Sequence, residues 1–231
     1  MRPDLLAPPP NPQVAEAWQR AWAGLVVAED DLGPVATVAG VDVAYHDQSG
    51  ELVAAAALLD ARTLTVLEEV TVRDQAQFPY IPGLFSFREC SPVARAVEAL
   101  SRRPDLIVCD GHGRAHPRRF GLACHLGVAL DLPTIGCGKT RLTGAETPPG
   151  PDRGAHTPLL DGAEVLGATL RTQSGVRPVY VSVGHRVSLP TALTWVLHLA
   201  PRYRLPETTR AADGLVRRTP ASPGTQPEAQ P

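Results

Sequence analysis

The first third of the chain alternates between apolar and polar positions in a way that predicts one helix followed by a sheet. Large apolar side chains recur at helical spacing within residues 13–30, which predicts an amphipathic helix there. Three β-type segments follow between residues 35 and 73, separated by the turn-forming runs DQSG and DART. Three consecutive strands with short connections predict an antiparallel meander.

The pattern changes at PYIPGLFSFRE, which interrupts the strands. Ser91 and Pro92 are residue types favoured at the N-cap and the first position of a helix, so we expect the helix SPVARAVEALSRR to begin there. The short apolar strand DLIVCD is of the kind that is buried on both faces of a parallel sheet. A helical run, RRFGLACHLGVALD, and another strand, LPTIGCG, come next, and this strand–helix–strand unit requires a parallel crossover.

The last third of the chain predicts a polar loop over residues 141–158, then the strand pair EVLGATLRT and RPVYVSVGH. Two helices are expected near 190–200 and 207–217. A meander that leads into a βαβ layer predicts an α/β fold with a ribonuclease-H-like mixed sheet, an antiparallel meander plus a parallel βαβ unit, and helices on both faces.

The organisation along the chain is expected to be a single domain with ragged ends. Residues 1–12 are Pro-rich and expected to be irregular, residues 13–218 form the domain, and the Pro-rich tail 219–231 has a disordered composition.

Composition and charge narrow the class of protein. The chain has 231 residues, 43% of them hydrophobic, and a formal net charge of −2, so a nucleic-acid partner requires a local basic patch. Four cysteines without a CxxC pair exclude a zinc ribbon and a disulfide scaffold, and predict buried free thiols in a reducing cytoplasm. Neither an 18-residue apolar run nor a signal-peptide core occurs in the chain, so we expect a cytoplasmic protein without a membrane partner.

Two aspartates point to a metal site. Strand alternation places Asp42 between Gly40 and Ala44 on one face, and Asp110 closes the buried strand LIVCD. Carboxylates on adjacent central strands repel each other unless a cation lies between them, so the pair predicts a Mg²⁺ or Mn²⁺ site. Taken alone, Asp42 would equally fit an edge-strand residue facing solvent.

The interrupting segment PYIPGLFSFRE has a second interpretation as a nucleic-acid contact. It concentrates apolar and aromatic side chains in a loop stiffened by Pro and Gly, which suits a wedge inserted into a base stack. We assign Tyr80, Ile81, Pro82 and Arg88 to that contact. Glu89 ends the segment, and its simpler interpretation is an acidic residue favoured near a helix N-terminus.

The run GHGRAHPRRFGLACHLG carries three histidines and three arginines, which predicts a local positive patch for phosphates that includes His116 and Arg118. A solvated cationic face is the alternative. His125 lies in the middle of the predicted helix and is expected to be a core histidine. The run PTIGCGKT is not a nucleotide-binding phosphate loop, because Pro133 stands where the first glycine is required.

The segments VAGVDVAY, FPYIPGLFSFRE, DGHGRAHPRRFGLACHLGV and PTIGCGKTRL occur in the order and spacing of the endonuclease V family, and the chain resembles that family from about residue 12 to 217. The resemblance implies a ribonuclease-H-like, Mg²⁺-dependent nuclease acting on double- or single-stranded DNA that contains deoxyinosine. Such enzymes nick the strand at the second phosphodiester bond 3′ to the lesion and leave 3′-hydroxyl and 5′-phosphate ends. A monomer is expected.

The resemblance also implies roles for individual residues. It makes Asp42 and Asp110 metal ligands, Glu89 a further acidic member of the site and Lys139 an active-site cation. Lys139 is also the only lysine beside 21 arginines.

Further implied roles concern the lesion and the C-terminal helix. Tyr80 becomes the wedge, and backbone groups at Gly111 and Gly136 are expected to read the flipped base. In the run PETTRAAD, Asp213 stands where the family often has histidine. We include Asp213 in the expected catalytic set.

Three other functions remain open from sequence. A different ribonuclease-H-like nuclease, such as a junction resolvase, would not distinguish inosine-containing from normal duplexes. An inosine-directed endoribonuclease differs only in its substrate, inosine-containing RNA. A non-catalytic nucleic-acid-binding module would bind without metal-dependent cleavage.

Overall fold

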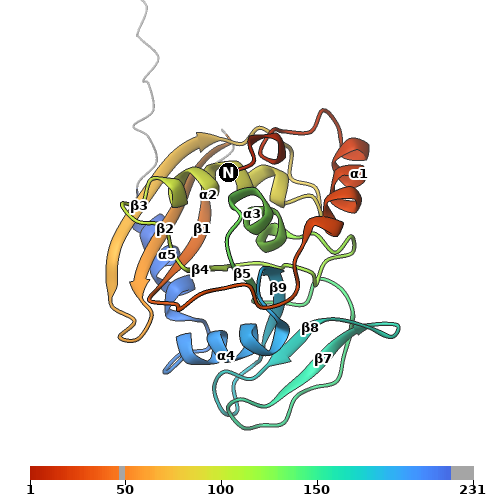
Figure 1. The fold of residues 1–231 in the computed structure, drawn as a ribbon, viewed down its shortest axis with the longest axis vertical. Helices are drawn as coiled ribbons and strands as arrows, with labels where there is room; N and C mark the ends of the chain where they lie inside the picture. The colour runs from red at the N-terminus through yellow and green to blue at the C-terminus, as the bar shows by residue number, and fades with distance from the viewer. Residues whose placement is uncertain (47–49, 220–231) are drawn as a thin grey trace, which may run out of the picture.

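The computed structural model describes residues 1–46 and 50–219. Over these residues the chain forms one mixed sheet in the order β3-β2-β1-β4-β5-β9-β8-β7-β6 (Figure 1). Its strands are β1 (Thr37–His46), β2 (Glu51–Asp60), β3 (Val66–Gln75), β4 (Leu106–Cys109), β5 (Thr134–Gly138), β6 (Ala145–Glu146), β7 (His156–Asp161), β8 (Glu164–Leu170) and β9 (Val179–His185).

Helices cover both faces of the sheet. The α-helices are α1 (Pro12–Trp22), α2 (Ser86–Glu98), α3 (Leu122–Leu130), α4 (Leu189–Leu199) and α5 (Glu207–Arg218), and short 3₁₀ helices span Pro3–Leu5 and Ala23–Leu25. Helices α2 and α3 pack on one face, whereas α4 and α5 pack on the other. None of these helices is long and apolar enough to cross a membrane.

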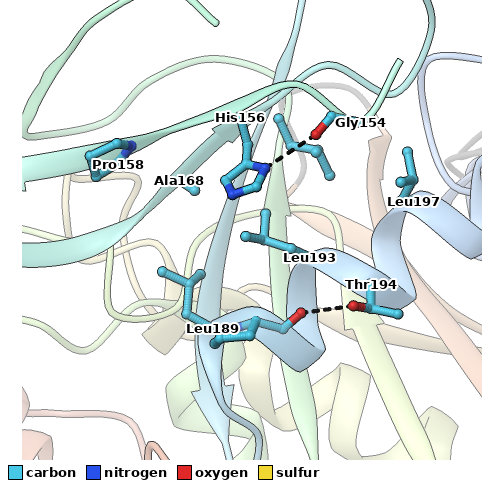
Figure 2. Close-up of a pocket in the computed structure, with 10 residues that line it drawn as sticks. Gly154, His156, Pro158, Ala168, Leu189, Leu193, Thr194 and Leu197 are labelled. Carbon is cyan, nitrogen blue, oxygen red and sulfur yellow. Dashed lines mark hydrogen bonds between the residues drawn. The ribbon is translucent and has the colours of Figure 1, made fainter. Parts of the chain in front are cut away.

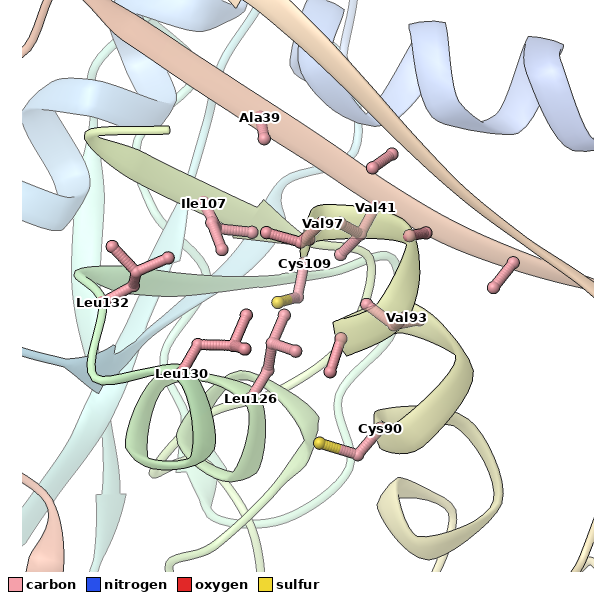
Figure 3. Close-up of a cluster of buried hydrophobic side chains, with 14 of the residues drawn as sticks. Ala39, Val41, Cys90, Val93, Val97, Ile107, Cys109, Leu126, Leu130 and Leu132 are labelled. Carbon is pink, nitrogen blue, oxygen red and sulfur yellow. The ribbon is translucent and has the colours of Figure 1, made fainter. Parts of the chain in front are cut away.

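The core follows the two-residue alternation of the central strands. Ala39 and Val41 of β1 pack with Ile107 and Cys109 of β4 under helices α2 and α3 (Figure 3). On the opposite face, Val38 packs with residues of β4, β5 and β9 under α4. The central strands are therefore buried on both sides, as the apolar run LIVC predicts.

Strand pairing confirms the predicted fold class. β1, β2 and β3 form the antiparallel meander, and β4 pairs parallel with both β1 and β5. Helix α3 forms the crossover between β4 and β5. The mixed sheet thus has the expected meander, the expected βαβ unit and helices on both faces.

Several predicted boundaries were wrong. The first helix ends at Trp22, and Leu5 in the segment expected to be irregular is buried, because a short 3₁₀ helix packs it against α3. The segment expected to be a loop contains β6 and the start of β7. Its polar composition hid these strands because they lie at an edge, where few side chains need to be apolar.

The largest correction concerns α2, which begins at Ser86 instead of after Ser91. Ser91 is therefore no N-cap, and Pro92 lies inside the helix. Phe87 and Cys90 on the additional turn are buried in two apolar clusters, so their burial outweighs the cost of an internal proline.

Other expectations are met within the described residues. Cys90, Cys109, Cys124 and Cys137 are buried free thiols. His125 is a core residue whose Nε2 lies 2.6 Å from the Leu5 carbonyl oxygen. The predicted turn DQSG and the predicted tail fall largely outside the described residues.

Candidate active site

The two predicted metal-binding aspartates lie side by side at one edge of the sheet. Val41 of β1 pairs with Cys109 of β4 in parallel register, so Asp42 and Asp110 each follow the same pair of residues. Asp110 directly follows the carboxyl end of β4, and Asp42 lies level with it in the second half of β1, which runs in the same direction. The structure therefore brings together the two residues that the sequence singled out.

Helix α5 brings a third carboxylate to this pair. A Cβ atom at Gly40 would lie 2.0 Å from the carbonyl oxygen of Thr208, so α5 rests directly on the backbone of β1 and requires glycine there. This close packing places Asp213, on the next turns of α5, where its charge acts on Asp42. The expected membership of Asp213 in the site thus has a structural basis.

Negative charge dominates this edge, although Lys139 forms an ion pair with Asp110 and Arg217 forms one with Asp213. Burial raises the pKa of Asp42 to about 6, and the charges of Asp110 and Asp213 add to this rise. Val43 N–H and the charge of Lys139 oppose the rise without cancelling it. Two carboxylates that are held so close favour a cation between them.

Lys139 follows β5 and lies beside the aspartates. Its ammonium forms an ion pair with Asp110. Burial alone would lower the pKa of Lys139, but the hydrogen bond and charge of Asp110, together with the charge of Asp42, raise it. Lys139 is therefore charged at neutral pH and sits directly at the carboxylate pair.

Glu89 lies on α2 and is 3% exposed. The Tyr45 hydroxyl donates a hydrogen bond of 2.7 Å to its Oε1, and the guanidinium of Arg88 lies 4.5 Å from the centre of the Tyr45 ring. Burial raises the pKa of Glu89 to about 8, and the charges of Asp42 and Asp110 contribute to the rise. Glu89 belongs electrostatically to the same site, but inside a helix instead of at the end of a loop.

A hollow of about 370 Å³ opens beside the carboxylates. One wall comes from the segment before α2, and the other from the turns that follow β4 and β5. Its lining includes Tyr80, Pro82, Asp110, Gly111, His116 and Lys139, all of them predicted site residues. The exposed fraction of Tyr80 is 68%, and its ring meets Phe85 edge-on.

Gly136, Ile81 and Arg88 lie outside this lining. Gly136 is buried beneath the turn after β4, where a Cβ atom would lie 2.5 Å from the Gly113 nitrogen. Ile81 packs against the aromatic cluster around Phe87, and Arg88 donates to the Phe78 carbonyl oxygen. The base-reading role of Gly136 and the DNA contacts of Ile81 and Arg88 stay predictions.

Side chains of the predicted cationic patch are mostly engaged in contacts within the protein. His116 Nε2 lies 2.9 Å from the Gly83 carbonyl oxygen, and burial, together with the charge of Arg118, lowers the pKa of His116 to about 4. Arg118 also donates to that carbonyl and to Gln19 Oε1. These two residues brace the loop that carries Tyr80. Their expected phosphate contacts stay predictions.

Sequence reasoning gave no role to Tyr45 or Arg204, and it placed His112 only in the predicted cationic patch. His112 lines the hollow, its Nδ1 is buried without a hydrogen-bond partner, and its ring lies against Gly138. Arg204 donates to the backbone carbonyl of Lys139 from the loop between α4 and α5. An arginine in this loop carries no signal in sequence, because the partners of Arg204 are backbone atoms remote along the chain.

The donor set fits a hard divalent cation. Mg²⁺ is commonly held by one or two carboxylates, with substrate phosphate and water as its remaining ligands. Asp42 and Asp110 supply such a pair, and their mutual repulsion is relieved by a cation. Within the described residues, no three acidic, histidine or cysteine side chains lie close enough together to hold a metal ion jointly, so Asp213 does not complete a three-ligand cluster with this pair.

Comparisons with known proteins agree with this geometry. The family model for endonuclease V matches residues 20–214. The endonuclease V of Roseiflexus sp. strain RS-1 is 53% identical over 201 residues, which cover 87% of this chain and 90% of that protein. The crystal structure of endonuclease V from Streptomyces avermitilis superposes with a TM-score of 0.87 at 52% identity, covering 91% of this chain and 93% of that one.

A further solved structure holds a nucleic acid. Endonuclease V of Ciona intestinalis, in complex with a 24mer DNA containing an inosine followed by a ribo-adenosine, has a TM-score of 0.77 and 26% identity, and the match covers 90% of this chain and 98% of that one. With the family model spanning most of the chain and relatives identical at half of the aligned positions, this chain belongs to the endonuclease V family.

Proposed function

We propose that the protein is a DNA repair endonuclease that nicks deoxyinosine-containing DNA at the second phosphodiester bond 3′ to the lesion, leaving 3′-hydroxyl and 5′-phosphate ends. The observation that carries the proposal is the placement of Asp42 beside Asp110 and Lys139, the last two of which line the hollow together with Tyr80. The inosine-containing DNA bound by the Ciona relative supports the substrate.

Asp42 and Asp110 would hold the metal, with Mg²⁺ proposed and Mn²⁺ acceptable to the same oxygens. When bound, the metal supplies an activated water and neutralises charge on the phosphate. Lys139 would leave its ion pair with Asp110 and contact a non-bridging phosphate oxygen, where it stabilises the charge that develops in the transition state. Asp213 adds negative charge that favours cation binding. Glu89, whose pKa of about 8 keeps it largely protonated at neutral pH, would add charge only once a bound cation displaces that proton.

The hollow would receive the extruded base. A volume of about 370 Å³ accommodates a purine, and exposed Tyr80 at its rim is available to stack where the base has left. The braces from His116 and Arg118 to Gly83 hold this rim in place. Gly111, with φ of +155°, makes a turn beside Asp110 that exposes backbone groups to the base.

The test is to incubate a duplex carrying one deoxyinosine with the protein and Mg²⁺ and to map the nick on a sequencing gel. We expect a single nick at the second bond 3′ to the lesion. The matched control, Asp110→Asn, is expected to bind the same duplex without cutting it, and metal binding is followed directly by calorimetry with Mn²⁺. Equal cutting of normal and inosine-containing duplexes would support a general nuclease instead.

An inosine-directed endoribonuclease is the second candidate. The observation that favours it is the ribo-adenosine placed after inosine in the DNA bound by the Ciona relative. A comparison of four strands, with deoxyinosine or inosine in DNA or RNA, separates the candidates through their single-turnover rates. Faster cutting of RNA would replace DNA as the proposed substrate.

A further inference from the structure

A group of arginines on one side of the site lacks carboxylate partners. They belong to the loops that flank β6, β7, β8 and β9 and to the loop between α4 and α5. Within the described part of the chain, none of the following forms an ion pair: Arg141, Arg153, Arg171, Arg177, Arg202 and Arg204. We call these six residues the arginine edge.

Strand register places this group in line with the carboxylates. Gly138 at the end of β5 pairs with Tyr180 near the start of β9, and Leu170 at the end of β8 pairs with Val179. His156 at the start of β7 pairs with Leu170. These strand ends therefore share one sheet edge with Asp42 and Asp110. Along that edge the charged residues follow one another in the order Asp42, Asp110, Lys139, Arg177, Arg171 and Arg153.

Hydrogen bonds to carbonyl groups hold part of the arginine edge in place. Arg204 donates to the carbonyls of Lys139, Arg177 and Pro178. Arg153 donates to the carbonyl oxygens of Thr172 and Ala200. Carbonyl oxygens satisfy the N–H donors but cancel none of the positive charge.

Two exposed members make no such contacts. Arg177 and Arg202 are exposed and form neither a hydrogen bond nor an ion pair through their side chains within the described residues. Burial of the Arg204 guanidinium lowers its pKa, and the positive charge of nearby Arg177 lowers it further. Like charges held together in this way favour an anion between or above them.

Acidic residues near this edge are few. Glu146 accepts hydrogen bonds from Tyr180 and Thr169, and Glu207 pairs with Arg210. Asp152 is exposed beside Arg153. Lys139 is paired with Asp110, and the six arginines alone outnumber the acidic residues here, although the whole chain is slightly negative.

The loop between α4 and α5 adds an aromatic surface. Tyr203 is 46% exposed, and the guanidinium of Arg210 lies 3.7 Å from the centre of its ring. Arginines combined with exposed aromatic rings are typical of surfaces that bind single-stranded nucleic acid.

The neighbouring hollow, by contrast, is apolar. It has a volume of about 520 Å³ and lies between β7, β8 and α4. Its lining consists mainly of apolar side chains, such as Pro158, Leu193 and Leu197 (Figure 2). His156 projects into this hollow, and no arginine lines it. A nucleic-acid backbone is therefore expected to bind along the arginine edge and not in this hollow.

We propose that the arginine edge binds the phosphates of the nucleic-acid strand on one side of the bond that is cut. The inference rests on the proposed function, because it needs the strand to pass Lys139. Neighbouring strands lie about 4.8 Å apart, so the edge from β5 to β7 is about 15 Å long. That length corresponds to about four nucleotides of a strand stacked as in B-form DNA, which rises 3.4 Å per nucleotide along its axis.

The test measures how binding depends on the length of the strand. Single strands with one deoxyinosine carry either two or eight nucleotides beyond the cut bond, on the 3′ or the 5′ side, and their dissociation constants are measured by fluorescence anisotropy in Ca²⁺. The variant is Arg177→Ala/Arg202→Ala. The matched control, Arg62→Ala/Arg102→Ala, removes two exposed arginines at the opposite sheet edge.

The affinity of the parent protein should rise when the strand is lengthened on one flank of the cut bond and not on the other, because the arginine edge extends from the site in only one direction. The double variant should lose that gain and bind the short strand as the parent does. Its slope of log K against log salt should be shallower by about 1.4, at about 0.7 per phosphate contact. The control and Arg177→Lys/Arg202→Lys should keep the parent slope.

Two results overturn the proposal: no length dependence in the parent, or a length dependence that the double variant keeps. Nicking of the short strand by the parent tests the proposed function separately. If the parent nicks the strand but shows no flank dependence, the proposed function stands and the proposal on the arginine edge is wrong. If the parent does not nick, the proposed function is wrong, and the salt slopes still decide whether the arginine edge binds phosphates.

Discussion

Charged side chains find different partners in two regions of the molecule: the sheet edge that carries Asp42 and Asp110, and the loop between β4 and α3. At the edge, Asp42 and Asp110 repel each other, and the Lys139 ammonium forms an ion pair with Asp110 alone. In the loop, Arg118 and Arg119 are surrounded by acceptors, and Arg119 alone contacts both Asp161 and Glu164. Uncompensated charge costs stability and so indicates a functional site, whereas satisfied charge supports the fold. Substitutions in the two regions should therefore separate activity from stability.

The largest effect is expected from Asp110→Asn. The amide keeps the shape of the side chain but removes the charge that binds a divalent ion, so nicking should fall to background. Repulsion on Asp42 is relieved, so the free energy of unfolding should stay the same or rise. Nicking assays in Mg²⁺ and chemical denaturation in EDTA measure the two effects. Parental nicking rates would remove Asp110 from the metal site.

Lys139→Ala should reduce single-turnover nicking by about 10²–10³, the usual cost of one preorganised transition-state donor. Lys139→Arg should also lose activity although it conserves charge, because a planar guanidinium is larger and fixes its donors in a fork. Inosine-DNA affinity in Ca²⁺ should change little in both variants. If the arginine variant nicks at the parental rate, Lys139 serves only as a phosphate tether.

Glu89→Gln should change the pH dependence of stability. The pKa of Glu89 is about 8 in the folded protein, above its ordinary value of 4.5. Between these values the folded state binds a proton that the unfolded state has released, so the free energy of unfolding falls as pH rises through this window. Below the window both states are protonated and the contribution of Glu89 is fully present.

Gln mimics the protonated carboxyl and keeps an acceptor for Tyr45. In metal-free buffer we expect it to match the parent at low pH and to exceed it by on the order of a few kcal/mol above pH 8. Urea denaturation at several pH values measures the difference. A constant offset between the two proteins at every pH would contradict the raised pKa.

Arg118→Ala should mainly cost stability. It removes charge-assisted hydrogen bonds to Gly83 and Gln19, worth about 1.5–3 kcal/mol each in partly buried positions. Arg20→Ala is the matched control, because the exposed Arg20–Glu16 pair on a helix contributes only about 0.3–0.5 kcal/mol. If Arg118→Ala leaves the unfolding free energy unchanged but weakens DNA binding, the sequence-based phosphate role is correct.

Tyr80→Ala should have the smallest effect and leave chemistry nearly intact. Stacking of an aromatic ring on a base contributes about 1–3 kcal/mol, so affinity for inosine-DNA should fall about 10- to 100-fold. The measurement is the affinity ratio between inosine-containing and normal duplexes, with single-turnover rates at saturating protein as the second readout. An unchanged ratio would exclude Tyr80 from the wedge role.

The sequence alone determined those features that depend on neighbours along the chain. Alternation along β1 and the end of the apolar strand LIVC placed Asp42 and Asp110 correctly, because strand period and strand ends are local properties. The parallel crossover followed from the order of strand, helix and strand, which also placed Lys139 at the same edge. The buried cysteines and the core position of His125 were likewise predictable.

Tertiary structure decided the features that depend on partners remote in the chain. Helix α2 starts early because its first turn is buried against other elements, and Arg118 braces a loop because Gly83 and Gln19 lie beside it. Asp213 reaches the site only because Gly40 lets α5 rest on β1. The arginine edge depends on antiparallel register. Residues tens of positions apart acquire a common edge only once the sheet has formed, so no local pattern in the sequence could reveal it.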